Sequence, residues 1–350
     1  MMMNHHKSIF FAGNFLSKTR STRSAGEELV DQLLKKDYSI FVASKYSNRF
    51  IRLLDLIFTA LKNSFKYDVA VVEVYSNLAF LWAEILGFLL KFLNKSIILV
   101  LHGGGLVEFY NRKPERVKKL FLLANIVTTP SMYLKQSFNH IRDDIIYVPN
   151  GIDIKSYNFR KRTVINPNFV WFRAFHQIYN PKMAIESVCL LDNQIKDICL
   201  QMIGPDKKDG SKDIVEQMID ENNLRTKIEL VGPIEKNTVP NWLDKSDIFL
   251  NTTNFESFGV SLVEAAACGL CIVTTNVGEL SYLWEHEGDA LLVQPDDPEA
   301  MASSIQRILD DPDLAGRLSM NARKKAERFD WSIILPQWEE LFADVLQNNP

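Results

Sequence analysis

The residues best suited to chemistry gather between positions 254 and 269. Glu256 stands just before a predicted helix, and Glu264 lies further along it. At a rise of about 1.5 Å per residue, eight helical residues would separate the two carboxylates by about 12 Å. That length is comparable to the reach from the sugar to the ribose of a sugar nucleotide, and carboxylates accept hydrogen bonds from hydroxyl groups. One glutamate could hold a sugar and the other a ribose; the alternative is a helix with two solvated glutamates.

The start of the same helix is suited to an anion. Ser257 is the predicted N-cap, and the first turn is predicted to contain Phe258, Gly259 and Val260. Backbone N–H groups in a first turn lack partners inside the helix and lie at its positive end. Gly259 lets a ligand approach the backbone closely. The segment therefore predicts a phosphate site.

The elements that must position these residues alternate between strand and helix. In the first half, short apolar runs predict strands, and longer amphipathic runs such as 24–36 predict helices. Strands that are apolar throughout and separated by helices indicate a parallel sheet covered on both faces, which is a doubly wound α/β domain. The predicted strands are 8–12, 39–43, 69–73, 97–102, 126–130 and 145–148. The apolar stretch 78–93 is interpreted as a buried helix rather than a membrane span, because charged residues interrupt the region.

The alternation then restarts, which favours a second doubly wound domain over one large sheet. Its predicted strands are 169–172, 199–203, 228–231, 247–251, 271–274 and 290–293, and its predicted helices are 181–191, 211–222, 238–244, 258–267 and 298–309. Turn-forming residues around Pro149, Asn150 and Gly151 place the junction there. The expected domains are 1–150 and 151–330, followed by a closing helix within 331–350.

Composition and charge narrow the function classes. A chain of 350 residues fits two domains, and its hydrophobic fraction of 47% is that of a globular protein. Cys268 and Cys271 have a redox or zinc spacing, but no second pair accompanies them, so we interpret them as small buried side chains. Without a recognisable export signal, the expected location is the cytoplasm.

Charge is unevenly distributed between the halves. Residues 1–150 carry 20 Lys and Arg against 12 Asp and Glu, whereas residues 151–350 carry 20 against 31. A basic half indicates attraction to an anionic surface, such as the inner leaflet of a membrane, with ordinary surface scatter as the alternative. The basic residues are not clustered on a nucleic-acid module, so no nucleic-acid partner is expected.

The segment 254–269 resembles the Glu-x7-Glu signature of retaining GT-B glycosyltransferases of the family 4 type, written E-x-F-G-x-x-x-x-E-A-x-A-x-G. All fixed positions match, which are Glu256, Phe258, Gly259, Glu264, Ala265, Ala267 and Gly269. The sequence from Pro149 to Asp153 is similar to the interdomain motif of that family. The resemblance implies two Rossmann-like domains that face each other across a cleft, the first on the acceptor side and the second binding the nucleotide sugar. It also implies that the closing helix crosses back to the first domain.

The resemblance implies roles for individual residues. Glu256 would contact the donor sugar, the amides from Phe258 to Val260 would face the sugar and diphosphate, and Glu264 would hold the ribose. Gly204 lies in a glycine turn, and Gly232 and Pro233 stand where the family lines the nucleotide base. The mechanism implied by the family needs no metal or other cofactor.

Further residues follow predicted strands, where open α/β sheets bind ligands. His102, followed by Gly103, matches a family histidine that points at the donor sugar; a capped strand end is the alternative. Gly13 and Asn14 correspond to a glycine loop that faces the diphosphate and acceptor.

The phosphate clamp departs from the family pattern. Arg173 matches its arginine, but Tyr179 and Asn180 stand where Lys-Gly is usual. A cation facing a departing diphosphate stabilises charge in a dry site. His176 or Lys182 could replace the lysine, or the Tyr179 hydroxyl could donate a hydrogen bond.

We therefore expect a glycosyltransferase that moves a hexose, with retention, from a nucleoside-diphosphate sugar such as a UDP-sugar. The expected acceptor is a glycan or a polyprenyl- or otherwise lipid-linked molecule, and the expected setting is bacterial cell-surface polysaccharide synthesis with peripheral membrane contact. The alternatives are an epimerase or phosphorylase on the same fold, and a non-catalytic subunit that binds a sugar nucleotide or a partner enzyme.

Overall fold

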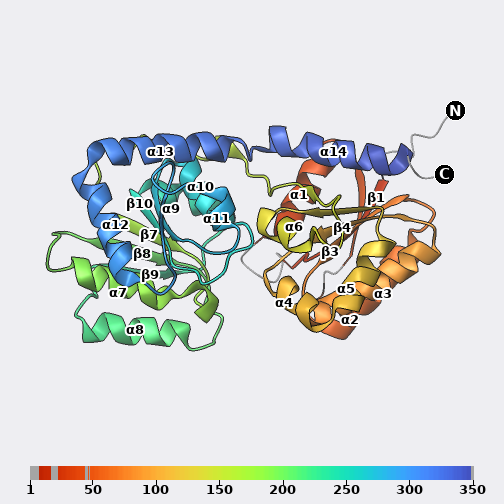
Figure 1. The fold of residues 1–350 in the computed structure, drawn as a ribbon, viewed down its shortest axis with the longest axis horizontal. Coiled ribbons are helices and arrows are strands. Elements are labelled where there is room, and N and C mark those ends of the chain that lie inside the picture. The colour runs from red at the N-terminus through yellow and green to blue at the C-terminus, as the bar shows by residue number, and fades with distance from the viewer. Residues whose placement is uncertain (1–7, 17–22, 44–45, 47, 348–350) are drawn as a thin grey trace. The chain divides into compact units, whose positions relative to one another are not determined.

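The computed structural model describes residues 8–16, 23–43, 46 and 48–347. The chain divides into two compact units (Figure 1), one formed by Met1–Gly151 with Trp331–Pro350 and the other by Ile152–Asp330. The break after Gly151 lies beside the turn-forming residues at which the sequence places the junction. No helix of the described residues is long and apolar enough to cross a membrane.

Unit 1 contains a six-stranded parallel sheet of order β2-β1-β3-β4-β5-β6. Its described strands are β1 (Ser8–Ala12), β2 (Ser39–Ala43), β3 (Val69–Val74), β4 (Ser96–Leu101), β5 (Ile126–Thr129) and β6 (Ile146–Tyr147). Its described helices are α1 (Ala25–Leu34), α2 (Arg49–Lys62), α3 (Leu78–Phe92), α4 (Gly105–Arg112), α5 (Pro114–Leu123), α6 (Met132–Phe138) and α14 (Trp331–Gln347).

Local sequence explains how several of these elements begin. A capping box opens α1, because the Ser24 side chain accepts from the Glu27 amide and the Glu27 side chain accepts from the Ser24 amide. β3 and β4 are buried along their whole length, as the apolar runs predict. The interpretation of α3 as a buried helix is wrong in part: Leu78, Leu81, Phe88 and Phe92 are exposed.

The closing helix, α14, belongs to unit 1 although it follows unit 2 in the sequence. Its apolar face, formed by Ile334, Trp338, Leu341, Phe342 and Val345, is buried. These side chains share a hydrophobic cluster with residues of α1 and of the central strands. The helix thus covers one face of the first sheet.

Unit 2 contains a second six-stranded parallel sheet, of order β12-β11-β10-β7-β8-β9. Its strands are β7 (Asn168–Phe172), β8 (Cys199–Ile203), β9 (Ile228–Gly232), β10 (Ile248–Asn251), β11 (Cys271–Thr275) and β12 (Leu291–Val293). Its helices are α7 (Pro181–Leu191), α8 (Ser211–Glu221), α9 (Val239–Asp244), α10 (Val260–Ala267), α11 (Leu280–Leu283), α12 (Pro298–Asp310) and α13 (Pro312–Glu327), with 3-10 turns η2 (Ile154–Ser156), η3 (Gln177–Tyr179) and η4 (Lys236–Thr238).

Each sheet has a point at which the strand order reverses. In unit 1, β1 lies between β2 and β3; in unit 2, β7 lies between β10 and β8. At such a point the loops at the carboxyl ends of neighbouring strands run to opposite faces and leave room for a ligand. We therefore expect ligand-binding residues in the loops after β1 and β3, and in the loops after β7 and β10.

Candidate functional site

Arg173 and Glu256 meet at the strand reversal of unit 2. Arg173 follows β7, and Glu256 lies in the loop that follows β10, the strand paired with β7. An Arg173 Nη2 atom contacts Glu256 Oε2, and both side chains are largely buried. Arg173 Nε also donates to Asn251 Oδ1 at 3.3 Å, and the side-chain nitrogen of Asn251, Nδ2, donates to Thr274 Oγ1 at 2.8 Å. The guanidinium is thereby held in one orientation at the carboxyl edge of the sheet.

The Glu256 carboxylate is fixed from its other side by backbone. Glu256 Oε1 accepts from the Ser257 amide at 3.0 Å and from the Phe258 amide at 3.4 Å. These two N–H groups therefore already have an acceptor. The sequence predicted that the Phe258 amide would face a phosphate, but in the structure it binds Glu256 instead. Gly278 packs behind this loop, where a Cβ atom would lie 2.3 Å from the Glu256 carbonyl oxygen.

The predicted start of the helix is wrong. α10 begins at Val260, and its N-cap is Gly259, not Ser257. Gly259 has φ of 93°, a left-handed conformation that costs glycine little. Among the described residues, the amides of Gly259, Val260 and Ser261 have no backbone or side-chain acceptor. The helix end that can receive an anion is thus shifted by about one residue.

Glu264 is buried on α10 and has its own pair of partners. The Tyr157 hydroxyl donates to Glu264 Oε1 at 2.7 Å, and Lys236 Nζ contacts the same oxygen. Lys236 lies on η4, three residues after Pro233. A carboxylate that already accepts from a tyrosine and a lysine has its second oxygen, Oε2, left to accept from hydroxyl groups.

Two glycines shape the edge of the sheet beside Arg173. Gly204 has φ of 150°, and a Cβ atom there would lie 1.9 Å from the Arg173 carbonyl oxygen. Gly232 has φ of 80°, and its carbonyl accepts from the Gly204 amide at 2.9 Å. Close backbone approach, rather than ligand contact, is what the structure requires of Gly204.

Of the three candidates for the missing lysine, only Tyr179 lies against the Arg173–Glu256 pair. The Arg173 guanidinium carbon is 5.4 Å from the centroid of the Tyr179 ring. Burial raises the pKa of Tyr179, so its hydroxyl stays protonated near neutral pH and can donate. His176 instead caps η3 and lies 3.8 Å from Asp209, while Lys182 pairs with Glu186 on α7.

The strand reversal of unit 1 is built around Glu73, a buried carboxylate at the end of β3. Glu73 Oε2 accepts from the Asn14 amide at 2.9 Å and from the Tyr75 hydroxyl at 3.1 Å. Its other oxygen, Oε1, lies 3.7 Å from His102 Nε2. The loop after β1 and the ends of β3 and β4 are thus joined by one carboxylate.

The His102 side chain is largely buried beside this carboxylate. Its ring stacks on that of Tyr75 at 5.1 Å between centroids. His102 Nε2 has no hydrogen-bond partner among the described residues, and burial lowers the pKa of the imidazole despite the nearby Glu73. Gly103 follows with φ of 77° and open space where a Cβ would stand.

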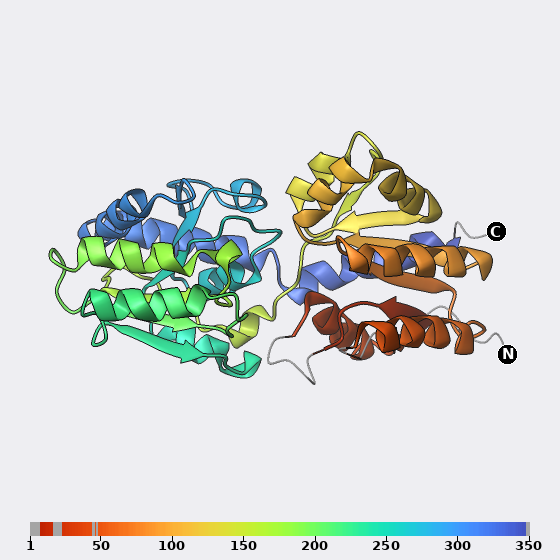
Figure 2. The same ribbon diagram turned by 90° about the horizontal axis from the view of Figure 1, so that it is seen from below.

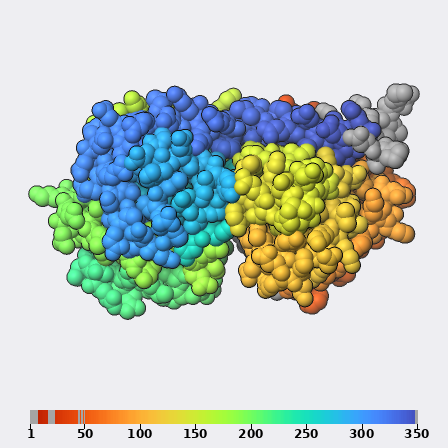
Figure 3. All heavy atoms as spheres, viewed as in Figure 1, coloured from red at the N-terminus to blue at the C-terminus, as the bar shows by residue number. Residues whose placement is uncertain are grey.

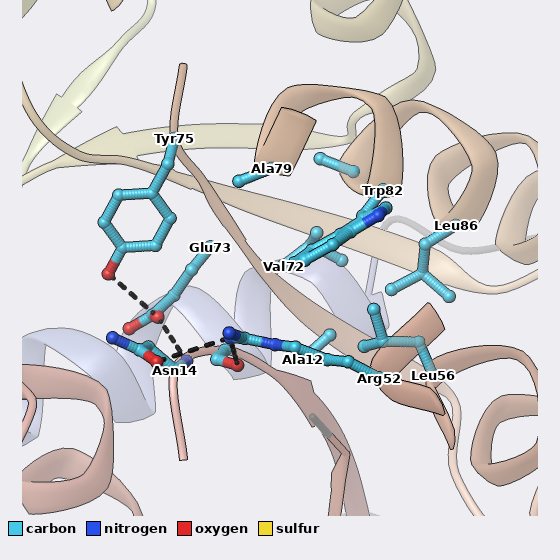
Figure 4. A pocket seen from close by; sticks show the side chains of 12 residues that line it. Ala12, Asn14, Arg52, Leu56, Val72, Glu73, Tyr75, Ala79, Trp82 and Leu86 are labelled. Atoms are coloured by element: carbon cyan, nitrogen blue, oxygen red, sulfur yellow. Dashed lines mark hydrogen bonds between the residues drawn. The ribbon is translucent and has the colours of Figure 1, made fainter. Parts of the chain in front are cut away.

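A cavity of about 190 Å³ opens at this reversal (Figure 4). Its polar side is formed by Asn14, Arg52, Glu73 and Tyr75, with Gly13 between them. Arg52 Nη2 donates to the Gly13 carbonyl at 3.2 Å and to Asn14 Oδ1 at 3.3 Å. The opposite side is apolar and comes from α2 and α3, with Leu56, Ala79, Trp82, Ala83 and Leu86. The cavity suits a ligand with both polar and apolar surface.

Residues 166–325 match the model of a family described as "Glycosyl transferases group 1". The matched residues all lie within unit 2, which resembles the members of this family. A stretch of 120 residues is 31% identical to D-inositol 3-phosphate glycosyltransferase of Thermobispora bispora, covering 34% of our chain and 28% of the relative. That match therefore spans less than a third of the relative's length.

Solved structures share the fold over nearly the whole chain. Sucrose-phosphate synthase from Thermosynechococcus elongatus has a TM-score of 0.80 at 18% identity, covering 97% of our chain and 99% of that chain. HepE of Anabaena, solved with UDP and glucose, has a TM-score of 0.74 at 18% identity, covering 97% and 100%. The expected GT-B fold is confirmed.

The candidate site contains residues that the sequence analysis did not single out. In unit 2 these are Asn251, Lys236 and Tyr157; in unit 1 they are Glu73 and Arg52. Glu73 carried a usable signal, since it is the one charged residue in the otherwise apolar β3. No sequence signal indicated the contacts of Lys236 and Tyr157, because their partner, Glu264, lies far from each of them along the chain.

The two cysteines do not form a reactive site. Cys268 and Cys271 are free and buried, and burial raises the pKa of each thiol to about 12. Cys271 Sγ lies 3.4 Å from the Ala315 carbonyl oxygen. Their interpretation as buried side chains is confirmed. Within the described ranges, no group of three His, Cys, Asp or Glu residues could hold a metal ion.

We expect Tyr179→Phe to lower kcat by about two- to tenfold, because it removes one neutral donor beside Arg173 whose net worth is about 0.5–1.5 kcal/mol. Steady-state kinetics on the variant measure this loss. His176→Ala and Lys182→Ala serve as comparisons and should retain kcat within about twofold. A larger loss in either of them than in Tyr179→Phe would show that the lysine is replaced elsewhere.

The lowered pKa of His102 predicts a dependence of stability on pH. The unfolded imidazole takes up a proton as pH falls below about 6.5, while the buried one stays neutral until lower pH. The free energy of unfolding should therefore be greatest above pH 6.5 and fall as the pH drops from there toward the folded pKa. Thermal melting from pH 8 to pH 5 should show a steeper loss in the native protein than in His102→Gln. His286→Gln, at an exposed position, should follow the native curve; parallel curves for all three proteins would contradict the prediction.

Proposed function

We propose that this chain transfers a hexose from a nucleoside-diphosphate sugar to a hydroxyl of a glycan or lipid-linked acceptor, with retention at the anomeric carbon. The observation that carries the proposal is the arrangement of Arg173, Glu256 and the start of α10 at the strand reversal of unit 2. A guanidinium and open helix amides suit a diphosphate, and two buried carboxylates suit sugar and ribose hydroxyls. The complex of HepE with UDP and glucose supports a uridine nucleotide as the donor.

The proposed roles follow from the donor groups that each residue has left. Arg173 uses Nη2 and Nε within the protein, so Nη1 is left to bind the leaving diphosphate beside the amides of Gly259 and Val260. Tyr179 adds a neutral donor to the same group. Glu256 orients the sugar while its charge stays paired with Arg173. Glu264 holds the ribose through its second oxygen, and Gly232 and Pro233 border the base.

The proposed reaction exchanges two bonds at one carbon. The bond from the anomeric carbon to the diphosphate oxygen breaks, and the acceptor oxygen bonds to the same face of that carbon. The acceptor's proton passes to the leaving phosphate, so no protein base is needed. The Glu256 carboxylate is held by Arg173 and two backbone amides, which makes it a poor nucleophile. A same-face displacement is consistent with this, because it needs no attack by a protein carboxylate. The role proposed for His102, which the resemblance implies, is contact with the donor sugar as a neutral imidazole, because burial lowers its pKa. No metal takes part in the proposed step.

The setting that we propose is the synthesis of a bacterial cell-surface polysaccharide by a cytoplasmic protein with peripheral membrane contact. The amphipathic cavity of unit 1 supports an acceptor with polar and apolar parts. Gly13, Asn14, Arg52 and Glu73 would bind acceptor hydroxyls there. The two alternatives are an epimerase and a non-catalytic binding subunit. The second is favoured by one observation, which is that Tyr179 stands where the family usually has a lysine.

A donor panel tests the proposal. UDP-, GDP- and ADP-sugars are screened by thermal shift, and donors that bind are assayed for hydrolysis and transfer. We expect one nucleotide class to raise the melting temperature and to be turned over. Glu256→Ala and Glu264→Ala should abolish or strongly reduce turnover, whereas Glu221→Ala at the exposed end of α8 should not. Binding without any turnover would identify a non-catalytic subunit, and unchanged turnover in both glutamate variants would show that the site is wrong.

A further inference from the structure

An unusual amount of apolar surface is exposed along α2. Phe50, Leu54, Phe58, Leu61 and Phe65 are all exposed, and Phe65, just after the helix, is 97% exposed. The spacing of four, four and three residues places the first four on one face of the helix, and Phe65 follows in the turn after it. The other face of α2 is inward, with Leu56 and Ala60 buried in the core of unit 1. The helix is therefore apolar on both faces, although only one of them is covered.

The neighbouring helix repeats this pattern. Leu78, Leu81, Phe88 and Phe92 of α3 are exposed, and Phe92 is 83% exposed. α2 and α3 contact each other and lie side by side in Figure 2. α5, whose Leu122 is 82% exposed, packs against the far side of α3 and forms part of the face seen in Figure 3. We call the exposed residues of α2 and α3, with Phe65, the α2–α3 surface.

Such a surface is not ordinary scatter. Soluble monomers rarely expose contiguous apolar patches larger than a few hundred Å², and larger patches mark protein or membrane contacts. Unit 2 provides an internal comparison, because Phe159 is its one exposed phenylalanine and is only 38% exposed. Its other exposed apolar side chains, such as Ile214 and Tyr282, stand on different elements.

Lysines border the α2–α3 surface. Lys62, Lys66 and Lys91 are exposed near the carboxyl ends of the two helices, and within the part of the chain that the structure describes none of them forms an ion pair. Lys62 Nζ lies 5.6 Å from the Phe58 ring centroid. The acidic side chain of α3, Glu84, is largely buried and paired with Arg116. Exposed aromatic and aliphatic side chains bordered by unpaired lysines are complementary to the boundary between acyl chains and anionic headgroups.

We propose that the α2–α3 surface binds an anionic lipid bilayer. Phe and Leu side chains enter the acyl boundary, and Lys62, Lys66 and Lys91 contact headgroup phosphates. The charge of the first half, 20 basic against 12 acidic residues in 1–150, adds long-range attraction. The surface adjoins the amphipathic cavity, since α2 and α3 supply its apolar side. This use of the surface rests on the proposed function, in which a lipid-linked acceptor is delivered from the same bilayer to the cavity.

Vesicle flotation tests the proposal with the full chain. Vesicles of phosphatidylglycerol and phosphatidylcholine are compared with vesicles of phosphatidylcholine alone, at 0.1 M and 1 M NaCl. We expect at least tenfold stronger partitioning onto the anionic vesicles at low salt. The double variant Phe58→Ser/Phe92→Ser should lose at least tenfold, and the triple variant Lys62→Gln/Lys66→Gln/Lys91→Gln on the order of a hundredfold.

Matched variants in unit 2 control for composition. Ile214→Ser/Tyr282→Ser removes exposed apolar groups, Lys196→Gln/Lys207→Gln/Lys208→Gln removes exposed charges, and both should float like the native protein. All variants should melt within a few degrees of the native protein, because the changed side chains are exposed.

Three outcomes would overturn the proposal. The native protein fails to float with anionic vesicles, or Phe58→Ser/Phe92→Ser floats equally well, or sedimentation shows a dimer that this variant dissociates, in which case a second copy covers the surface. Hydrolysis of a soluble donor is measured in parallel and should be unchanged in the surface variants. Flotation without donor turnover in the native protein would refute the proposed function alone, and turnover without flotation would refute the membrane surface alone.

Discussion

Replacing Arg173 by alanine is expected to lower kcat by about two to three orders of magnitude. The guanidinium is held at the carboxyl edge of the second sheet by Glu256 and Asn251, in a largely buried position. A fixed cation in a dry site stabilises charge that develops on a leaving group by about 3–4 kcal/mol, since no reorganisation is needed during the reaction. Its loss should affect kcat more than KM, because the charge on the diphosphate oxygen grows in the transition state.

Two further variants separate catalysis from folding. Arg173→Lys keeps the charge but loses the fork that binds Glu256, Asn251 and the diphosphate together, so partial activity is expected. Arg225→Ala removes an arginine that pairs with Asp220 on the surface and should leave kcat unchanged. Melting temperatures report on folding, and donor titration by thermal shift reports on binding. A loss of less than tenfold in Arg173→Ala, with folding intact, would remove this residue from the proposed mechanism.

Replacing Gly204 by alanine is expected to destabilise unit 2 by at least about 3 kcal/mol, from a disfavoured backbone conformation together with a steric clash. Its φ is 150°, and the added Cβ would stand 1.9 Å from the carbonyl oxygen of Arg173. Backbone must move to relieve that contact, and the backbone in question carries Arg173. A lower melting temperature, by about 6–12 °C for a unit of this size, should therefore accompany a loss of activity.

Gly210→Ala is the matched control for this substitution. Gly210 also has a positive φ, of 89°, but a Cβ atom there meets nothing within 4 Å. Its replacement should cost only the conformational preference, about 1 kcal/mol. Equal destabilisation by the two alanines in thermal melting would show that the close approach to Arg173 is unimportant.

Much of this fold can be predicted from the sequence, because buried parallel strands are apolar throughout. The runs 8–12, 39–43 and 199–203 have the predicted bounds, and the closing helix lies within the predicted range. The start of α10 could not be predicted in the same way. Ser257 is a good N-cap by residue type, but its amide is used by Glu256, and the left-handed Gly259 opens the helix instead. Local preference failed where the Glu256 side chain binds the backbone amides.

The candidate site could be predicted only where a residue shows its role by type and position. Glu256 and Glu264 stand in a recognisable spacing, but their partners come from distant parts of the chain. Tyr157 is 107 residues from Glu264, and nothing near it in the sequence indicates that contact. The exposure of α3 could not be predicted for a similar reason. An apolar run of this length is typical of a buried helix, and the sequence does not show which elements will pack against that helix.

The position of α14 affects the order in which the protein can fold during synthesis. Unit 1 is discontinuous: its sheet is made first, but the helix that covers Leu29, Val30 and Leu33 is made after the whole of residues 152–330. At roughly 5–20 residues per second, a ribosome needs on the order of ten seconds or more to produce that interval. During this time the growing chain exposes an unfinished apolar face, while unit 2 can fold as an insertion. In vectorial folding, completion of unit 1 therefore follows the synthesis of unit 2, although the sheet of unit 1 is made before unit 2.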